Sequence, residues 1–166
     1  EAHGGQPVMS QVGHSLMKAK LRETGALLAG EMSGHIFFND RFFGFDDALY
    51  ATCRVIEILS KRGKSLSDLL SDVPETFATP ELRRDCPEDI KFEIPGIVAD
   101  YFADDFEVTT VDGARVKFED GWGLVRASNT QPKLVLRAEG LSPEQRDTYL
   151  ERLEEAVADA NEQLNQ

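Results

Sequence analysis

The sequence predicts an α/β unit followed by an α+β unit. In residues 1–72, helical patterns alternate with short apolar runs, which is typical of strands packed beneath helices. Residues 81–166 contain several short strand-like runs separated by Asp-Gly turns and end in a long amphipathic helix. Between them, residues 73–80 (VPETFATP) hold two prolines and no helical period, which indicates a linker.

The first unit is expected to open with a helix at residues 13–24 (GHSLMKAKLRET). These residues are rich in helix formers, and Gly25 follows as a stop. The apolar run 26–29 predicts a short buried strand, and residues 36–38 (IFF) predict a second one. Residues 30–35 between them form a loop of small and polar side chains.

A second helix is expected over residues 46–62, where apolar side chains recur at helical spacing. Asp46 is well placed as its N-cap and Gly63 as its end. A further short helix at 65–70 would be capped by Ser65.

The second unit reads as a set of short strands with two helices. Five strands are predicted, at about residues 81–85, 106–111, 114–119, 123–127 and 133–139. The Asp112-Gly113 pair between two of them is a strong hairpin signal. Asp120-Gly121 predicts the next turn.

The two helices of this unit carry different terminal signals. A helix at about 88–102 contains Pro95, which lacks a backbone donor, so we expect a kink there. The last helix is expected at 143–161, with Ser142 as N-cap and Pro143 in the first helical position.

Composition excludes several classes of partner. The chain has 166 residues and a net charge of -12, which argues against a nucleic-acid partner because phosphate backbones need a basic face. No apolar run approaches the roughly 20 residues that cross a bilayer, and no signal peptide is visible, so we expect no membrane partner and a cytoplasmic location. The two cysteines have no metal-type spacing and are expected as free thiols. The opening residues, EAHGGQ, lack a Met and look like the end of a helix, which suggests a fragment of a longer protein.

The loop at 30–35 (GEMSGH) is the first candidate site. Its glycines allow a sharp turn, and Glu31, Ser33 and His35 offer an acceptor, a hydroxyl and a titratable ring within five residues. Such a set suits a ligand with several hydroxyl groups. A simple polar turn with an exposed histidine would have the same composition.

The loop at 126–130 (RASNT) is the second candidate site. Arg126, Ser128, Asn129 and Thr130 gather a guanidinium, two hydroxyls and an amide where a strand becomes a loop. This assembly suits a phosphate, because a guanidinium binds it with two hydrogen bonds and loop amides can surround it. A solvated turn is the equal alternative.

Two further groups are weaker candidates. His14 lies at a helix start, where anions are favoured, although a surface or capping role is the commoner one. Arg41, Asp46 and Asp47 could form a cluster, but we expect the two aspartates to be first-turn helix acids.

The two candidate loops, in this order and about ninety residues apart, resemble the sugar-binding and phosphate-binding loops of the α-D-phosphohexomutases. The nearest group is the bacterial phosphomannomutase/phosphoglucomutases. The flanking segments GHSLMKAKL, RFFGFDDALYATCRVIEIL and GWGLVRASNTQPKLVLRAEG resemble the same family.

The resemblance implies a fold for each unit. Residues 1–72 would be the C-terminal part of the family's third domain, a three-layer α/β/α domain. Residues 81–166 would be the complete fourth domain, a four-stranded, mostly antiparallel sheet with two helices, similar to the TATA-binding protein. Because the third domain would lack its opening strands, we expect it to expose an apolar face.

The resemblance also implies an activity for the whole enzyme. The family interconverts hexose 1-phosphates and 6-phosphates, of mannose or glucose here, through a phosphoserine and a bisphosphorylated sugar. Mg²⁺ and glucose 1,6-bisphosphate as activator are implied for the full-length enzyme. Neither the phosphoserine loop (Ser-His-Asn) nor the metal loop (Asp-Gly-Asp-Gly-Asp-Arg) occurs in the sequence. The chain alone is therefore predicted to be inactive, to bind no metal, and to need the N-terminal half of the enzyme as its partner.

By the same resemblance, Glu31 and Ser33 would bind sugar hydroxyls, and His35 would be a sugar ligand or general acid/base. His14 would contribute to the sugar or phosphate contacts. The phosphate ligands would be Arg126, Ser128, Asn129 and Thr130. Two alternatives are a non-catalytic module that binds sugar phosphates and a hydrolase that pairs Glu31 with Asp46 or Asp47.

Overall fold

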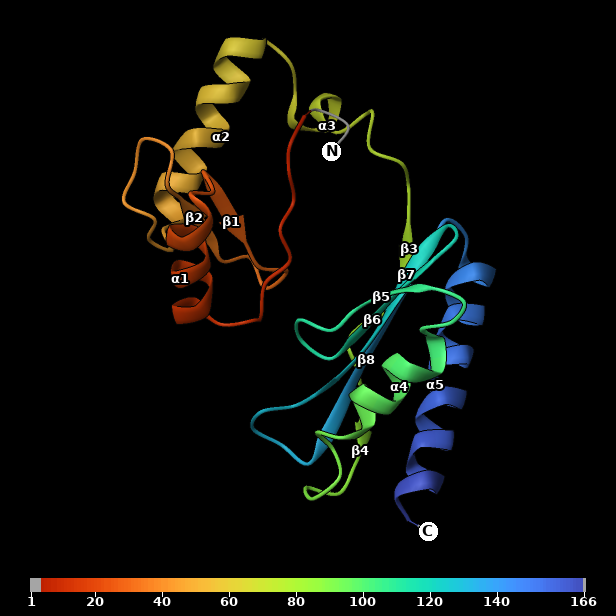
Figure 1. Ribbon diagram of the computed structural model, residues 1–166. Helices are drawn as coiled ribbons and strands as arrows, with labels where there is room; N and C mark the ends of the chain where they lie inside the picture. Colours follow the sequence, from red (N-terminus) through yellow and green to blue (C-terminus); the bar gives the residue numbers. More distant parts are fainter. Residues whose placement is uncertain (1–3, 166) are drawn as a thin grey trace. The chain divides into compact units, whose positions relative to one another are not determined.

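The structure, a computed structural model, describes residues 4–165 and divides into two units between Pro74 and Glu75 (Figure 1). The division falls inside the segment 73–80 that the sequence predicts as a linker. Part of that segment is not a linker, because residues 77–78 form a strand in the sheet of the second unit. The fold of the second unit therefore begins earlier than residue 81.

An antiparallel strand pair and two helices form most of the first unit. Strand β1 (Leu28–Gly30) pairs with β2 (Ile36–Phe38). Helix α1 (His14–Thr24) precedes the pair, and helix α2 (Ala48–Arg62) follows it. The predicted first helix and second strand are confirmed.

The first strand differs from its prediction. β1 begins two residues later than the predicted run 26–29, and Leu28 is 55% exposed rather than buried. A strand in a two-stranded pair has only one neighbour, and such a pair buries little by itself. On β2, by contrast, Phe37 is completely buried. The strand pair therefore has one anchored position and a largely exposed first strand.

Helix α2 is capped by Asp47 and not by Asp46, which corrects the sequence prediction. The Asp47 side chain accepts a hydrogen bond from the Tyr50 amide at 2.8 Å, so the helix begins at Ala48. Asp46 forms an isolated bridge with Phe37 on β2 instead. Only one of two adjacent aspartates can occupy the N-cap position, and the other is left for a different contact.

The remaining helix ends of the first unit agree with the sequence. Gly63 closes α2 in the left-handed conformation, with φ 62°, which glycine adopts without strain. Ser65 caps helix α3 (Leu66–Leu69) in a reciprocal arrangement with Asp68.

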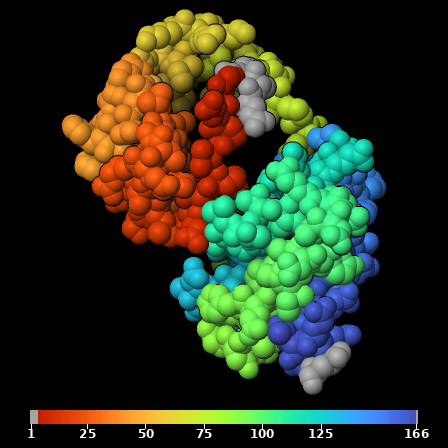
Figure 2. All heavy atoms as spheres, in the orientation of Figure 1, coloured from red at the N-terminus to blue at the C-terminus, as the bar shows by residue number. Residues whose placement is uncertain are grey.

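The first unit leaves apolar side chains of α2 uncovered, as the resemblance led us to expect. Leu49 is 82% exposed and Ile56 is 58% exposed, and α2 lies at the surface in the space-filling view (Figure 2). A hollow of about 350 Å³ beside it is lined by Ile36, Phe38 and Val55. Exposed apolar side chains beside an apolar hollow are typical of a site that another segment covers.

Arg41 does not form a cluster with Asp46 and Asp47. Its guanidinium donates to Glu57 of α2 at 3.2 Å, and Lys61 donates to the same carboxylate at 2.6 Å. These hydrogen bonds, first from Lys61 and then from Arg41, lower the pKa of Glu57 to about 2. The carboxylate therefore links the loop that follows β2 to the middle of α2.

This ion-pair network predicts a pH dependence of stability. The pKa of Glu57 is lower in the folded chain, at about 2, than the roughly 4.3 of an unfolded glutamate. The network therefore stabilises the first unit above about pH 4.5, and this stabilisation disappears as the pH falls towards 2. We expect Glu57→Gln to flatten that acid-side slope. Hydrogen exchange of α2 amides between pH 2 and 5 measures it, and equal slopes in both proteins would contradict the role of Glu57.

The second unit is an antiparallel sheet with two helices. The sheet order is β3-β8-β7-β6-β5, and β4 also pairs with β8. The strands are β3 (Phe77–Ala78), β4 (Leu82–Asp85), β5 (Glu107–Thr109), β6 (Ala114–Phe118), β7 (Gly121–Ala127) and β8 (Lys133–Gly140).

The mixed α/β fold is confirmed, but this sheet has six strands where the resemblance implied four. β8 is long enough to pair with two short strands on one edge, β4 at one end and β3 at the other. All strand pairings in this sheet are antiparallel.

Helix α4 (Ile94–Phe102) is shorter than predicted and has no kink at Pro95. The helix begins one residue before the proline, so Pro95 lies in the first turn. At this position the missing backbone N–H would have no partner within the helix, and the proline costs little. Residues 88–93 form turns instead of a first helical segment.

Helices α4 and α5 (Pro143–Leu164) contact each other and cover one face of the sheet (Figure 1). Ser142 caps α5 as predicted, and the helix runs three residues past the expected end. Its Leu153 is completely buried against Phe102 of α4 and inward side chains of the sheet such as Val125. This core supports the strand from which the predicted phosphate loop leaves.

Within residues 4–165, no helix is long and apolar enough to cross a membrane. Both cysteines are free, with Cys53 exposed on α2 and Cys86 buried beside the core of the second unit.

Candidate functional site

The loop between β1 and β2 folds into a tight turn that gathers its polar side chains. The Glu31 amide donates to the His35 carbonyl at 2.9 Å, and the Gly34 amide donates to the Glu31 carbonyl at 3.0 Å. Gly34 has φ 91°, a conformation that favours glycine. The turn therefore holds Glu31, Ser33 and His35 at one end of the strand pair.

Glu31 carries the clearest sign of a ligand site in this turn. Ser33 donates to its Oε2 at 3.4 Å, but among residues 4–165 its buried Oε1 has no hydrogen-bond partner. A buried acceptor without a donor costs about 1–3 kcal/mol. A hydroxyl group of a bound ligand would supply that donor.

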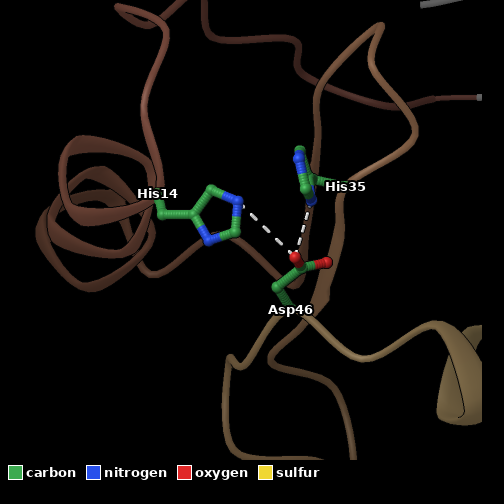
Figure 3. A group of neighbouring side chains, drawn as sticks. All are labelled: His14, His35 and Asp46. Atoms are coloured by element: carbon green, nitrogen blue, oxygen red, sulfur yellow. Dashed lines mark hydrogen bonds and ion pairs between the residues drawn. The ribbon is translucent and has the colours of Figure 1, made fainter.

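His14, His35 and Asp46 converge beside the same turn (Figure 3). His35 Nδ1 lies 2.7 Å from Asp46 Oδ2, and His14 Nε2 lies 3.6 Å from the same oxygen. A carboxylate only accepts, so His35 Nδ1 carries a proton, and in the neutral ring Nε2 is then the acceptor. Asp46 thus fixes the ring orientation and tautomer of His35.

Asp46 is held in this position by a second hydrogen bond. Its Oδ1 accepts from the Ile36 amide at 3.2 Å. Partial burial acts to raise the pKa of Asp46, but the hydrogen bonds from His35 and Ile36 and the two nearby imidazoles outweigh it and lower the pKa. The group therefore remains a carboxylate at neutral pH.

The contact of Asp46 with His35 is the feature of this unit that sequence reasoning missed. Asp46 was assigned to the helix cap because of its position just before an amphipathic helix. The one available signal was the adjacent Asp47, since a helix needs a single N-cap residue.

The RASNT loop connects β7 to β8 in the second unit. Arg126 lies on β7 opposite Val135, and the loop folds back on the Ser128 hydroxyl. That oxygen accepts from the Thr130 amide at 3.4 Å and from the Gln131 amide at 3.2 Å. These amides already have a partner, so the loop is a serine-closed turn rather than an open cradle of free N–H groups.

Arg126 and the exposed tip of this loop are the groups that an anion could contact. The Arg126 side chain is 21% exposed, and its Nη1 lies 3.9 Å from Asp112 on the neighbouring hairpin. Asn129 and Thr130 are both exposed at the loop tip. The structure thus brings Arg126, Ser128 and the tip residues onto one loop, as the sequence predicts.

A buried lysine holds the end of the same loop. Lys91 is 1% exposed, and its Nζ donates to the Gln131 carbonyl at 3.0 Å and pairs with Glu88 at 2.7 Å. Sequence reasoning missed this contact, because the two partners are forty residues apart and no local sequence pattern marks Lys91 as buried.

Two family models match the chain in tandem. The phosphoglucomutase/phosphomannomutase α/β/α domain III matches residues 1–77, and the phosphoglucomutase/phosphomannomutase C-terminal domain matches residues 81–160. This chain belongs to the phosphoglucomutase/phosphomannomutase family. Its two units correspond in order to the family's third and C-terminal domains.

Individual family members agree with this assignment. A phosphomannomutase/phosphoglucomutase of Pseudomonas aeruginosa is 50% identical over 144 residues, which are 86% of this chain and 31% of that protein. A phosphoglucomutase of Neisseria gonorrhoeae is 49% identical over 140 residues, covering 82% of this chain and 30% of that protein. The chain thus spans about a third of the length of these curated relatives.

A solved structure gives the same result for the fold. The crystal structure of a phosphoglucomutase/phosphomannomutase family protein from Burkholderia thailandensis matches with a TM-score of 0.78 and 44% sequence identity. The match covers 96% of this chain and 34% of that protein.

The side chains of this family member do not suit Mg²⁺. In residues 4–165, the one group of three potential metal ligands is His14, His35 and Asp46. Mg²⁺ prefers an octahedron of oxygen ligands, whereas two of these three are imidazoles. This group is therefore not a Mg²⁺ site.

Proposed function

We propose that this chain is the sugar- and phosphate-binding half of a phosphohexomutase, an isomerase that interconverts hexose 1-phosphates and 6-phosphates of mannose or glucose. Membership of the phosphoglucomutase/phosphomannomutase family supports the reaction class. The observation that carries the proposal is the buried, unpartnered Oε1 of Glu31 beside the Ser33 hydroxyl. A sugar hydroxyl is a donor and an acceptor and matches both groups.

His35 is proposed as the proton carrier of the sugar site. Its Nδ1 is occupied by Asp46, so its Nε2 is the atom that accepts a proton from a sugar hydroxyl or returns it. His14, whose ring packs edge-on against His35 with centroids 4.2 Å apart, is proposed as a further sugar or phosphate contact. Asp46 acts by positioning His35.

The phosphate that is not reacting is proposed to bind Arg126, Ser128, Asn129 and Thr130. A local positive group suffices for this, even at a net charge of -12, because binding depends on the nearby field. Binding at the loop would also hold the fourth domain on the substrate and help exclude water from the phosphorylated enzyme.

The remaining parts of the reaction are proposed to come from the rest of the enzyme. The phosphoserine and Mg²⁺ belong to that part, since the sequence lacks the two loops that would hold them. Glucose 1,6-bisphosphate is proposed as the activator of the full-length enzyme. The exposed apolar side chains of α2, such as Leu49, are proposed to contact the N-terminal half. The cytoplasm is proposed as the location of the whole enzyme.

A non-catalytic module that binds sugar phosphates is the second candidate function. It is favoured by the absence of the phosphoserine and metal loops from the sequence, and it predicts ligand binding without turnover. Turnover by this chain alone would instead favour a hydrolase and would contradict both proposals.

Complementation tests the main proposal. The N-terminal half of the enzyme is added as a separate polypeptide, and conversion of mannose 1-phosphate to the 6-phosphate is followed with Mg²⁺ and a trace of glucose 1,6-bisphosphate. Activity in the mixture, with none from either part, is the expected result. An inert mixture, combined with no binding of mannose 1-phosphate to this chain in calorimetry, would contradict the proposal.

Glu31→Gln is expected to weaken sugar recognition more than phosphate recognition. The amide keeps the shape of the side chain but replaces one acceptor oxygen by a donor, so a sugar hydroxyl loses a charge-assisted hydrogen bond of about 1.5–3 kcal/mol. Calorimetry with mannose 1-phosphate and with inorganic phosphate separates the two effects. A variant that loses affinity for phosphate alone would remove Glu31 from the sugar site.

A further inference from the structure

His14, His35 and Asp46 come from three separate elements and offer three metal-ligand atoms within 4.8 Å of one another. His14 begins α1, His35 precedes β2, and Asp46 lies just before α2 (Figure 3). Two imidazoles and one carboxylate on one side of an ion form a common protein site for late first-row divalent metals. We propose that this cluster binds Zn²⁺ or a similar ion.

Contacts with β2 hold the side chains of the cluster in place. Phe37 is completely buried, forms the isolated bridge with Asp46, and packs edge-on against the His14 ring with centroids 5.6 Å apart. The Ile36 amide holds Asp46 Oδ1, which leaves Oδ2 directed at the two imidazoles. Such outer contacts orient the ligands before the metal arrives, so binding has less ordering to impose.

The two distances from Asp46 to the imidazoles bracket those of a loaded site, and the two imidazole nitrogens lie within 4.8 Å of each other. Zn²⁺ lies about 2.0–2.2 Å from nitrogen and oxygen ligands, so two ligand atoms of a tetrahedral ion are roughly 3.3 Å apart. Here the Asp46 oxygen lies 2.7 Å from His35 Nδ1 and 3.6 Å from His14 Nε2. On binding, His35 changes tautomer: Nδ1 gives up its proton and Nε2 takes one up from solvent, so the ring stays a neutral imidazole. Nδ1 and Asp46 then exchange their mutual hydrogen bond for bonds to the metal.

The site would keep an open coordination position. The side chains of His14 and His35 are 48% and 41% exposed, so water or another small ligand can complete the tetrahedron. The preference for imidazole also separates this site from the oxygen-rich site that Mg²⁺ needs. Metal binding here is therefore independent of the Mg²⁺ of the proposed mutase reaction.

One consequence rests on the proposed function. If His14 and His35 contact the sugar, a bound Zn²⁺ occupies the same imidazoles, and zinc and sugar phosphate compete. Zinc binding itself does not depend on that role.

Calorimetry with zinc chloride tests the site on the whole 166-residue chain in excess MgCl₂. We expect one Zn²⁺ per chain. His14→Gln and Asp46→Asn should each weaken binding at least about tenfold, the scale seen for changes at metal sites. His3→Ala and Cys53→Ser, which remove the third histidine and the exposed thiol, are the matched controls and should bind as the unaltered chain does.

Circular dichroism and a thermal melt establish that each variant is folded. His14→Gln changes an exposed helix start and keeps the proposal testable if Asp46→Asn unfolds. Absence of zinc binding to the unaltered chain would overturn the proposal, as would undiminished binding to the folded His14→Gln chain. Failure of mannose 1-phosphate to displace bound Zn²⁺ would count against the proposed sugar contacts of the histidines and leave the metal site standing.

Discussion

Arg126→Ala in the whole enzyme is expected to lower kcat/KM for mannose 1-phosphate by about 30-fold to several thousand-fold. This corresponds to about 2–5 kcal/mol, the cost of removing one partner from a largely buried charged contact. The Arg126 side chain is mostly buried at the end of β7, so little of it remains to be ordered when a ligand binds. No other cation of the RASNT loop can replace it, because Arg126 is its single basic residue.

Steady-state kinetics with both sugar phosphates measures this effect, and Arg115→Ala is the matched control. Arg115 lies on the adjacent strand β6, and its guanidinium lies over the Trp122 ring, 5.0 Å from the ring centroid. The control should retain its kinetics within a few-fold. Unchanged kinetics of Arg126→Ala would remove this residue from the phosphate site.

Local patterns were sufficient for most of the fold. Capping residues and periodicity predicted α1, α3 and α5, since each depends on contacts within a few residues. The start of α4 was misplaced because the apolar pattern continues upstream of Pro95 through residues that form turns. Proline is tolerated in a helix only in the first turn. The position of a proline should therefore count for more than apolar periodicity when the start of a helix is predicted.

In the candidate site, too, contacts between near neighbours in the sequence were predictable and contacts between distant residues were not. Glu31, Ser33 and His35 lie within one turn, so their spacing alone predicted that they gather. The contact between His35 and Asp46 spans eleven residues and depends on where β2 ends and α2 begins. The contact of Lys91 with the RASNT loop spans forty residues and depends on the sheet. The adjacent Asp47, which takes the N-cap of α2, is the one local signal for the first contact, and the second contact has none.

Gly113→Ala is expected to destabilise the second unit by about 3 kcal/mol. Gly113 has φ 83°, which costs a side-chain-bearing residue roughly 1–2 kcal/mol. A β-carbon there would also lie 2.3 Å from the Val125 carbonyl oxygen and 2.6 Å from Arg126 Cβ. Overpacking of this kind costs about 1–3 kcal/mol more. Because the overlap is with Arg126 itself, binding of mannose 1-phosphate should weaken as well.

Gly96→Ala is the matched control in the same unit. Gly96 is exposed in α4, and nothing lies within 4 Å of a β-carbon built there, so alanine should stabilise the helix by about 0.5–1 kcal/mol. Trp122 on β7 is the one tryptophan of the chain, so its fluorescence reports urea unfolding of this unit for both variants. Opposite shifts of the two midpoints are expected. A Gly113→Ala midpoint equal to that of the unaltered chain would mean that the hairpin relaxes around the new methyl group, and the close approach of Gly113 to Arg126 would then have no part in holding the phosphate loop.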